Sequence, residues 1–305
     1  MGALQDKVCV ITGAGRGIGR AHALLMAAEG AKVVVNDLGA AADGSGTDAG
    51  PAAAVVEEIL NAGGQAVANT SDISTWQGAE ELVSTALREF GDLHVLVNNV
   101  GFLRDRTIVK MTEQEWDSLI GVHLKGHFGP LHFAAAYWRD QIRAGIEVPR
   151  SVINTTSPSG LFAQPGQSNY AAAKSAIATL TMVADSELRR YGVRVNAIAP
   201  AAATRMTADQ GLSVGDDSEW SMFDPANISP MVAYLAEPDC PIHGRMFFVM
   251  GGEVHLFHPW HIVDSIRTEQ RFTVDELRSS AGKFADRTFD YGHPMGEAMR
   301  GELPT

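Results

Sequence analysis

Tyr170 and Lys174 are four residues apart and have the side-chain types of an acid–base pair. Ala, Ile, Leu, Met and Val are frequent in residues 168–190, which predicts one helix, and on a helix this spacing puts both side chains on the same face, one turn apart. An ammonium group beside a phenol favours the phenolate, so we expect the pKa of Tyr170 to fall from about 10 toward the working range. Tyr170 could then serve as a general base toward an alcohol and as a general acid toward a carbonyl.

Ser157 lies thirteen residues before the tyrosine and directly follows residues 151–156, a run that predicts a strand. A hydroxyl at that place could hydrogen-bond the substrate oxygen while Tyr170 moves the proton. A tyrosine and a lysine at helical spacing also occur by chance as a surface pair. The serine at this distance, together with a nucleotide loop near the amino terminus, favours the catalytic interpretation.

A glycine-rich loop follows residues 7–12, an apolar run that predicts a buried strand, and precedes residues 20–29, which have helical character. In that order the glycines let the backbone approach a pyrophosphate, and the free amide groups at the start of the helix face it. A glycine triplet alone is weak evidence, and the strand before it and the helix after it supply the context that phosphate binding needs. The predicted cofactor contacts in the loop are Gly13, Arg16, Gly17, Ile18 and Gly19.

Asp37 ends the second predicted strand, residues 32–37. A carboxylate there can accept a hydrogen bond from a ribose hydroxyl of the adenosine and would repel a 2′-phosphate, which favours NAD over NADP. Arg16, beside the loop, argues weakly for NADP, and it can also be read as a solvated loop cation. We therefore expect NAD as the cofactor.

Further cofactor contacts are expected where later strands end. Asp72 and Ile73 follow the third predicted strand, residues 65–69, where a doubly wound sheet would turn the chain toward the adenine. The strand at residues 94–99 ends in two amides and leads to a glycine, which suits a backbone turn beside a cofactor, although turn chemistry alone would also account for them. The contacts expected from that turn are Asn99, Val100 and Gly101.

Strands and helices alternate along the chain, without an internal repeat. Residues 112–144 read as one or two helices broken near Gly126 and Gly129. Later strands are expected at residues 151–156, 193–199 and 246–249. Such alternation predicts an α/β fold with a doubly wound, mainly parallel sheet covered by helices on both faces. We expect a single catalytic domain, residues 1–252, followed by a C-terminal extension, residues 253–305.

The composition excludes several classes of partner. The 305 residues carry a formal net charge of −12, and no cluster of Lys and Arg appears of the kind that nucleic-acid binding needs. No apolar run approaches the length of a membrane span and no signal peptide is visible, so we expect a soluble, cytoplasmic protein. Two cysteines, Cys9 and Cys240, make no disulfide framework.

From about residue 7 to residue 253 the chain resembles the classical short-chain dehydrogenase/reductase family. The features that match in order and spacing are the glycine signature of residues 12–19, the turn of residues 98–101, Ser157, Tyr170 and Lys174. The resemblance implies a Rossmann-type sheet, a nicotinamide cofactor, and hydride transfer to or from the carbon of a secondary alcohol. The partner is thus expected to be a small-molecule alcohol or ketone, and the oligomer a homotetramer.

The same resemblance implies a role for each residue of the set. Tyr170 donates or accepts the proton, and Ser157 orients the substrate oxygen. Lys174 holds the nicotinamide ribose and lowers the pKa of the tyrosine, so that Tyr170 and Lys174 also count among the cofactor contacts.

Two positions depart from the family pattern. His123 stands where the family usually has an asparagine, which is thought to hold a helix kink and, through its main-chain carbonyl, a relay water. A histidine presents the same carbonyl, and we do not assign His123 a role as acid or base. In residues 200–206 the usual Pro-Gly is missing. Thr204 is the expected partner of the nicotinamide carboxamide, with Pro200 among the cofactor contacts.

Four segments resemble one branch of the family, the dehydrogenase domain of the peroxisomal multifunctional enzyme type 2 and its bacterial relatives. They are residues 33–39, 122–126, 198–206 and 272–277. The branch implies a 3-hydroxyacyl-CoA ester or a hydroxysteroid-type substrate. A CoA ester needs cations near its phosphates, for which Arg104 and Arg205 are candidates.

Two segments are expected to shape access to the substrate site. Residues 206–224 fall where the family places its substrate-covering segment, although an ordinary surface loop is an equal alternative. In the extension, Thr273 and Glu276 form a capping box that predicts a short helix over residues 274–283. We expect the extension to pack on the same domain or on a neighbouring subunit.

His255, His258 and His261 recur at every third residue near the start of the extension. No carboxylate or cysteine completes a ligand set with them, and Phe257 and Trp260 interleave them, which favours packing. We therefore predict no metal site.

Two alternative functions remain. Within enzymes, the chain could be an NADPH-dependent 3-oxoacyl reductase, which Asp37 opposes because its carboxylate would repel the 2′-phosphate. In another class, it could be a catalytically inactive nucleotide-sensing or scaffold protein on the same fold. The intact set of Ser157, Tyr170 and Lys174 opposes that interpretation.

Overall fold

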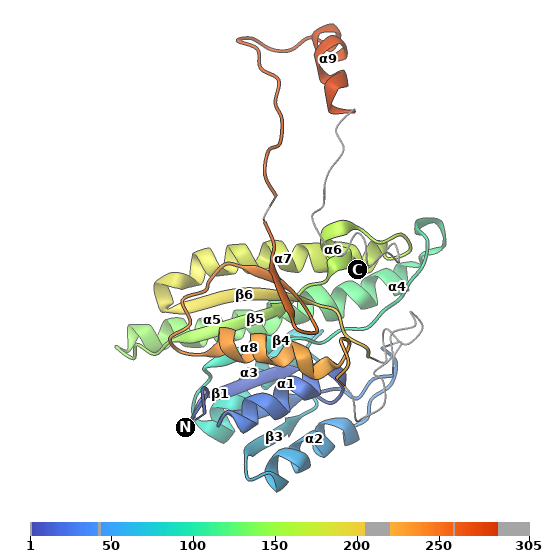
Figure 1. Cartoon of the computed structure of the whole chain (residues 1–305). Coiled ribbons are helices and arrows are strands. Elements are labelled where there is room, and N and C mark those ends of the chain that lie inside the picture. The colour runs from blue at the N-terminus through green and yellow to red at the C-terminus, as the bar shows by residue number, and fades with distance from the viewer. Residues whose placement is uncertain (1, 42–43, 205–219, 259, 286–305) are drawn as a thin grey trace. The chain divides into compact units, whose positions relative to one another are not determined.

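The computed structural model, which describes residues 2–41, 44–204, 220–258 and 260–285, contains an eight-stranded sheet with the order β3-β2-β1-β4-β5-β6-β7-β8 (Figure 1). The strands are β1 Val8–Thr12, β2 Lys32–Asn36, β3 Gln65–Asn69, β4 Val95–Asn98, β5 Arg150–Thr155, β6 Val193–Pro200, β7 Met246–Met250 and β8 Glu253–Leu256. Every pairing is parallel except that of β7 with β8.

The central strands β1, β4 and β5 are buried along their whole length, as expected where helices cover both faces of a parallel sheet. β1 pairs with β2 on one side and with β4 on the other, so the direction of chain winding reverses there. Open α/β sheets of this kind bind ligands at the carboxyl ends of the strands beside such a reversal.

Helices connect the strands and cover the sheet. They are α1 Gly17–Ala28, α2 Gly50–Asn61, α3 Trp76–Phe90, α4 Glu113–Ile120, α5 Gly126–Arg143, α6 Pro158–Phe162, α7 Ser168–Leu188, α8 Ser229–Ala236 and α9 Val274–Ser280. Short 3-10 helices are Ile108–Lys110, Arg189–Tyr191, Pro225–Ile228 and Ala281–Phe284, and a π-helix spans Gly121–Lys125.

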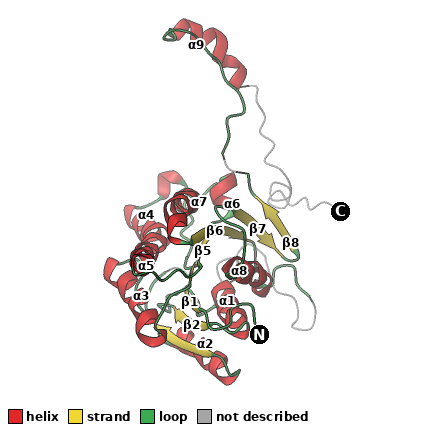
Figure 2. Ribbon diagram, turned by 90° about the vertical axis from the view of Figure 1, so that its left-hand side faces the viewer, coloured by secondary structure: helices red, strands yellow, loops and turns green. Residues whose placement is uncertain are grey.

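Helices lie on both sides of the sheet (Figure 2), and two clusters of buried side chains fill the space between them and the strands. On one face α1, α2 and α8 contribute Met26, Ile59 and Val232 to a cluster of buried side chains. On the other face α3 and α5 contribute Leu82 and Trp138 to a second cluster, together with the end of α7. Burial of each such side chain stabilises the fold by about 1.5–3 kcal/mol.

The predicted fold class, α/β with a doubly wound and mainly parallel sheet, is confirmed. The predicted break within residues 112–144 is the π-helix Gly121–Lys125, which joins α4 to α5. Gly129 lies inside α5 and breaks nothing. A Cβ atom there would stand 2.8 Å from the Cβ of Ala79, so the glycine permits the close approach of α5 to α3.

The chain divides into two compact units, Met1–Phe257 and His258–Thr305. The second unit begins at His258 and not at residue 253, because β8 pairs with β7 and so belongs to the sheet.

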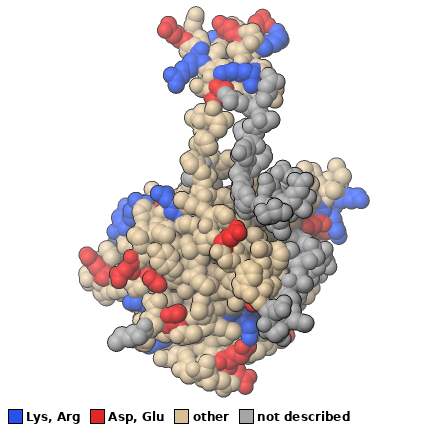
Figure 3. All heavy atoms as spheres, viewed as in Figure 1, with Lys and Arg blue, Asp and Glu red and all other residues tan. Residues whose placement is uncertain are grey.

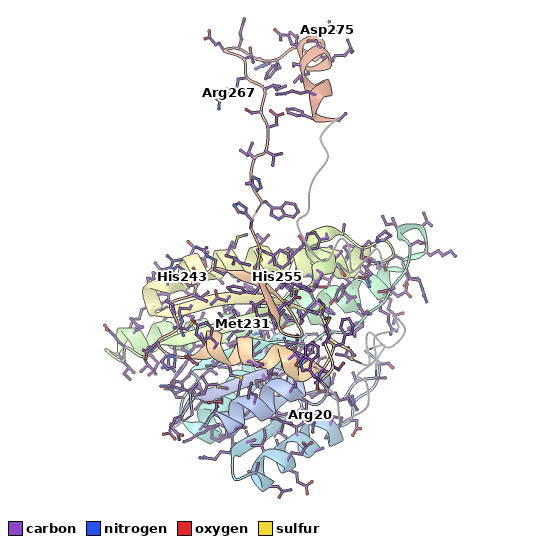
Figure 4. The ribbon with its side chains drawn as sticks, in the orientation of Figure 1. Arg20, Met231, His243, His255, Arg267 and Asp275 are labelled. Atoms are coloured by element: carbon purple, nitrogen blue, oxygen red, sulfur yellow. The ribbon has the colours of Figure 1, made fainter. Side chains whose placement is uncertain are left out.

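Within the second unit, the predicted capping box opens α9. The Thr273 hydroxyl accepts a hydrogen bond from the Glu276 amide at 3.2 Å, and the Glu276 carboxylate accepts one from the Thr273 amide at 2.7 Å. The helix ends at Ser280, earlier than predicted, and tightens into a 3-10 turn. Arg278 forms an exposed ion pair with Asp275, which Figure 4 labels on α9.

Charged side chains are scattered among uncharged ones on the face of the first unit that Figure 3 shows. An exposed pair joins two helices of this unit, since Arg20 on α1 contacts Glu58 on α2 (Figure 4). Among the described residues, no helix combines the length and the apolar character that crossing a bilayer requires.

A buried ion pair ties the amino ends of the central strands together. The Arg150 guanidinium is only 2% exposed and donates to Asp92 at 2.6 Å and to the carbonyl of Leu93. The Tyr137 hydroxyl donates to the same carboxylate at 2.8 Å. Burial opposes ionisation of Asp92, but the hydrogen bonds from Arg150, Leu93 and Tyr137 outweigh it and lower the pKa of Asp92.

Arg150→Met should lower the free energy of unfolding by about 3 kcal/mol, because it leaves the Asp92 carboxylate without its buried partner. The loss should shrink as the pH falls through the range in which Asp92 takes up a proton, since a carboxyl with a lowered pKa contributes stability only above that range. Urea unfolding at several pH values measures both effects. The control is Arg139→Met, whose exposed pair with Asp140 should contribute less than about 1 kcal/mol. Equal losses in the two variants would contradict the structural role of Arg150.

Candidate active site

Tyr170 and Lys174 lie in the first two turns of α7, and their side chains are almost completely buried, with 9% and 2% exposed. The Lys174 Nζ atom lies 5.6 Å from the centre of the Tyr170 ring. Asn169 fixes the start of the helix, since its Oδ1 accepts a hydrogen bond from the Tyr170 amide at 2.8 Å and its Nδ2 donates to the Arg104 carbonyl at 3.2 Å. The two residues are therefore an interior pair and not a surface pair.

Ser157 follows β5 and caps the short helix α6, where its Oγ accepts a hydrogen bond from the Ser159 amide at 3.2 Å. Ser157 is close enough to the phenol of Tyr170 to lower its pKa in part. A glycine permits this approach of α6 to α7, because a Cβ atom at Gly160 would stand 2.6 Å from the Ser175 amide nitrogen. The structure thus brings the three predicted catalytic residues together from two elements.

The prediction that Lys174 lowers the pKa of Tyr170 is wrong for the protein chain by itself. Burial raises the pKa of Tyr170, the hydrogen bond with Ser157 lowers it in part, and the charge of Asp105 raises it further. Burial also lowers the pKa of Lys174 to about 7, and its Nζ donates to the Thr155 carbonyl at 2.7 Å. Because loss of hydration disfavours the charged form of each group, the spacing of the pair does not by itself give a phenolate.

A groove opens at the carboxyl ends of β1, β2 and β4, where the winding of the sheet reverses. Most of the predicted cofactor contacts line it. They are Gly13, Arg16, Gly17, Ile18, Gly19, Asp37, Asp72, Ile73, Asn99, Val100, Gly101 and Thr204. Tyr170 and Lys174 do not line this groove, and neither does Pro200, which ends β6.

The groove also has walls that the sequence did not predict. Leu38, Ala40, Ala41 and Gly44 belong to the glycine- and alanine-rich segment that follows β2, and they line the groove beside Asp37. Phe102 and Val122 line it as well, next to the catalytic set. This loop begins directly after β2 and Asp37, and that position in the sequence could have indicated that the loop lines the site.

The glycines of the loop have the conformations and the clearances that a bound dinucleotide needs. Gly13 has φ of +65°, and a Cβ atom on Gly19 would stand 2.0 Å from the Gly13 carbonyl oxygen, so both positions require glycine. The first turn of α1 has no side-chain cap and no acidic residue, which leaves its amide groups available to an anion. These features fit the pyrophosphate of a nicotinamide dinucleotide.

Asp37 lies at the rim of the groove in a fixed orientation. Its Oδ2 accepts a hydrogen bond from the Gly15 amide at 2.8 Å, and its Oδ1 accepts one from the Gly39 amide at 2.7 Å. Arg16, on the same rim, donates to the Ala40 carbonyl at 3.2 Å. Arg16 is thus a loop cation with a protein partner and not a purely solvated one.

Asn99 connects the glycine loop to β4. Its side-chain amide donates to the carbonyls of Thr12 and Gly13 at 3.1 and 3.3 Å, and its main-chain amide donates to the Thr12 hydroxyl at 2.9 Å. Asn99 therefore holds the shape of the loop as well as lining the groove.

His123 occupies the π-helix and is completely buried. Its Nε2 lies 2.9 Å from the Phe102 carbonyl and 3.0 Å from the Phe102 amide, and its ring stands edge-on to the Tyr170 ring at 5.3 Å. Burial and the charge of Lys174 hold the pKa of His123 well below its usual value. Gly101 is a glycine for this reason, since a Cβ atom there would stand 2.4 Å from the His123 ring.

The remaining predicted positions lie away from the groove or outside the described residues. Arg205 and most of the predicted substrate-covering segment fall in residues 205–219, which the structure does not describe. His255 on β8 pairs with Glu253 at 2.8 Å (Figure 4). Within the part of the chain that the structure describes, no group of three His, Cys, Asp or Glu side chains is placed to hold a metal ion.

A doubly wound sheet with a glycine cradle at its reversal and a Ser, Tyr and Lys set beside it defines a nucleotide-dependent oxidoreductase. The chain belongs to the short-chain dehydrogenase family, whose sequence profile matches residues 7–213. It is therefore a short-chain dehydrogenase/reductase that uses a nicotinamide cofactor.

Individual relatives agree with this assignment. The chain is 43% identical over 282 residues to the hydroxyacyl-CoA dehydrogenase ChsB1 of Mycobacterium tuberculosis, a match that covers 89% of this chain and 84% of that protein. It is 42% identical over 248 residues to the peroxisomal hydratase-dehydrogenase-epimerase of Saccharomyces cerevisiae, which covers 81% of this chain and 26% of that longer protein. A short chain dehydrogenase from Mycobacterium avium, known from a crystal structure, shares 45% identity with a TM-score of 0.86, over 95% of this chain and 98% of that chain. The predicted resemblance to the multifunctional-enzyme branch is confirmed.

Proposed function

We propose that this protein is an NAD-dependent dehydrogenase that oxidises the secondary alcohol of a 3-hydroxyacyl-CoA ester or of a hydroxysteroid-type substrate. The observation that carries the proposal is the buried set of Tyr170, Ser157 and Lys174 beside a groove whose rim holds Asp37.

Each of the three residues, Ser157, Tyr170 and Lys174, has its own role in alcohol oxidation. The Ser157 hydroxyl binds the substrate oxygen and holds it toward the tyrosine. The Tyr170 oxygen, in its ionised form, takes the proton of the alcohol, and Lys174 would hold the ribose of the cofactor. NAD, when bound, supplies the acceptor for the hydride that leaves the alcohol carbon.

The substrate class comes from the relatives and from one contact. The names of the relatives specify a hydroxyacyl-CoA dehydrogenase and a peroxisomal hydratase-dehydrogenase-epimerase. Arg104 lies with its guanidinium 5.8 Å from the centre of the Phe102 ring, and Phe102 lines the groove. A cation at that place supports the binding of a substrate that carries phosphates at some distance from its reacting carbon.

The preference for NAD rests on Asp37. Two main-chain amides hold its carboxylate at the rim, so it cannot swing away from an added phosphate without losing both hydrogen bonds. Arg16 on the same rim favours the NADPH-dependent 3-oxoacyl reductase as the second candidate, because a guanidinium can bind a 2′-phosphate. We favour NAD because two main-chain amides hold the Asp37 carboxylate in place, whereas the Arg16 guanidinium donates to the Ala40 carbonyl.

The test is an initial-rate assay of the purified protein with NAD and with NADP, over 3-hydroxyacyl-CoA esters of several lengths, hydroxysteroids and simple cyclic alcohols. We expect the highest kcat/KM for a CoA ester or a steroid with NAD. A higher kcat/KM for 3-oxoacyl reduction with NADPH would select the second candidate. Tight binding of NAD with no turnover of any substrate would favour the nucleotide-sensing alternative.

Three further features belong to the same proposal. We expect a homotetramer, a cytoplasmic location, and an extension after the catalytic domain that packs on its own domain or on a neighbouring subunit. Sedimentation analysis of the full chain, compared with a chain that ends at residue 257, measures the oligomer and the contribution of the extension to it.

A further inference from the structure

His127 is a second buried histidine near the catalytic set, and the mechanism above does not use it. It lies in the first turn of α5, one turn after His123, and its side chain has no exposed surface. Neither of its ring nitrogens has a hydrogen-bond partner among the described residues, and neither has Nδ1 of His123 or the hydroxyl of Thr155. Buried polar atoms without partners are rare, and a group of them indicates interior water or a function.

Main-chain carbonyls and one charge surround the His127 ring. Burial and the charge of Lys174 hold the pKa of His127 well below its usual value, against the carbonyls of His123, Thr155 and Asn98, which favour the protonated ring. These groups come from the π-helix, β5, β4 and α7, the elements that face the ring. The Thr155 carbonyl also accepts the hydrogen bond of the Lys174 Nζ at 2.7 Å. One carbonyl therefore lies beside both the lysine and the histidine.

The chemistry of alcohol oxidation requires a path for a proton out of this interior. The alcohol proton taken up by the set must leave before the next turnover, and Tyr170 and Lys174 are both buried. A Lys174 whose pKa is about 7 can release a proton near neutral pH. A neutral imidazole carries a proton on one nitrogen and a lone pair on the other, so it can accept on one side and release on the other.

We infer that His127 passes protons between Lys174 and water held in this interior, a role that rests on the proposed function. A water that bridges the two residues takes a proton from the Lys174 Nζ and gives one to the ring nitrogen that bears the lone pair. The N–H bond on the opposite nitrogen then breaks, and its proton goes to a second water. The ring is then neutral in its other tautomer, and the second water carries the proton and its charge toward solvent. Rotation of the ring, or a second proton exchange through the same waters, restores the starting tautomer.

A structural histidine looks different in the same protein. His22 is also completely buried, on α1, and its Nε2 has no partner among the described residues, but its Nδ1 lies 2.8 Å from the Ser229 hydroxyl. Burial alone lowers the pKa of His22, to about 3, and no charged neighbour adds to it. His22 therefore provides a matched control for His127.

The kinetic test compares His127→Phe, His127→Gln and the control His22→Gln. Both changes at His127 should lower kcat about tenfold with KM nearly unchanged, because proton release becomes limiting. Both should also raise the solvent deuterium isotope effect on kcat, which a loss of packing would not do. A glutamine keeps a polar side chain at this position but cannot exchange a proton between two nitrogens, so recovery of activity in His127→Gln would overturn the inference. An unchanged kcat and isotope effect in both variants would overturn it equally.

A second measurement needs no substrate and no variant that might fail to fold. In the unliganded protein labelled with nitrogen-15 in histidine, the ring N–H of His127 should exchange with water much faster than that of His22. Equal protection of the two rings would overturn the inference. Fast exchange at His127 in a protein that oxidises no alcohol would leave the proton path standing and the proposed function refuted.

Discussion

Tyr170→Phe should lower kcat for alcohol oxidation by about 10³-fold while the affinity for the nicotinamide cofactor stays nearly unchanged. The change removes one oxygen atom, the one that lies within reach of Ser157 and takes the alcohol proton. It leaves the ring in its place against His123, so the packing of the site should persist. Steady-state kinetics and titration of the intrinsic fluorescence with NAD measure the two quantities separately.

The matched control for this variant is Tyr191→Phe. Tyr191 lies in the 3-10 turn after α7, with the Arg190 guanidinium 4.8 Å from the centre of its ring, and it touches no part of the groove. Its kcat should remain within about twofold of the wild type, as for a surface substitution. If Tyr170→Phe also kept most of its turnover, the proton acceptor would have been assigned to the wrong residue.

Asp37→Asn should lower the ratio of kcat/KM with NAD to kcat/KM with NADP by about 10²-fold, because it removes the like charge that opposes a 2′-phosphate. Asparagine has nearly the same shape and keeps an oxygen for one of the two amides, Gly15 or Gly39, while its NH2 group faces the other. Arg16, already on the rim, should then add to the affinity for NADP. Parallel kinetics with both cofactors give the ratio.

Asp48→Asn controls for a general change in surface charge. Asp48 lies on the same loop, is exposed, and does not line the groove, so its removal should leave the ratio unchanged. A wild-type protein that preferred NADP, or an Asp37→Asn variant with an unchanged ratio, would show that the carboxylate does not select the cofactor.

The parts of the fold that depend on local sequence could be predicted. β1 and β2 are uninterrupted apolar runs between turn residues, and the glycines that follow β1 can be placed without knowing what packs on them. The positions of Asp37 and of the Ser157, Tyr170 and Lys174 set follow from where strands end and helices begin. Such features are fixed by spacing along the chain, which the sequence shows directly.

The features that depend on contacts between distant segments could not be predicted. The pKa of Tyr170 is set by burial, and that burial comes from neighbours on other elements, including Phe102 and Leu119. The first unit ends at Phe257 because β8 pairs with β7. The sequence of so short an edge strand does not by itself reveal this pairing. The loop that carries Ala40 lines the groove, and this too depends on contacts with segments distant in the sequence.

His127 was missed although the sequence held a signal for it. It stands four residues before Leu131 and eleven before Trp138, both of which are buried, so it shares the inner face of α5. A histidine on the apolar face of a helix is more often a packing residue of the core than a residue that transfers protons. The Thr155 carbonyl, which lies beside both His127 and Lys174, is what separates a proton carrier from a packing residue. This contact involves α5, α7 and β5, so the sequence alone could not show it.

The most direct test of the account is to follow the hydrogen on the alcohol carbon. A 3-hydroxyacyl-CoA with deuterium at its third carbon should be oxidised with NAD, and the reduced cofactor should be analysed by mass spectrometry. We expect each turnover to deliver the deuterium to the nicotinamide, with none released to water, and Tyr170→Phe to nearly abolish the transfer. Deuterium found in the solvent, or a cofactor that stays oxidised while the protein is folded and binds it, would contradict hydride transfer at this site.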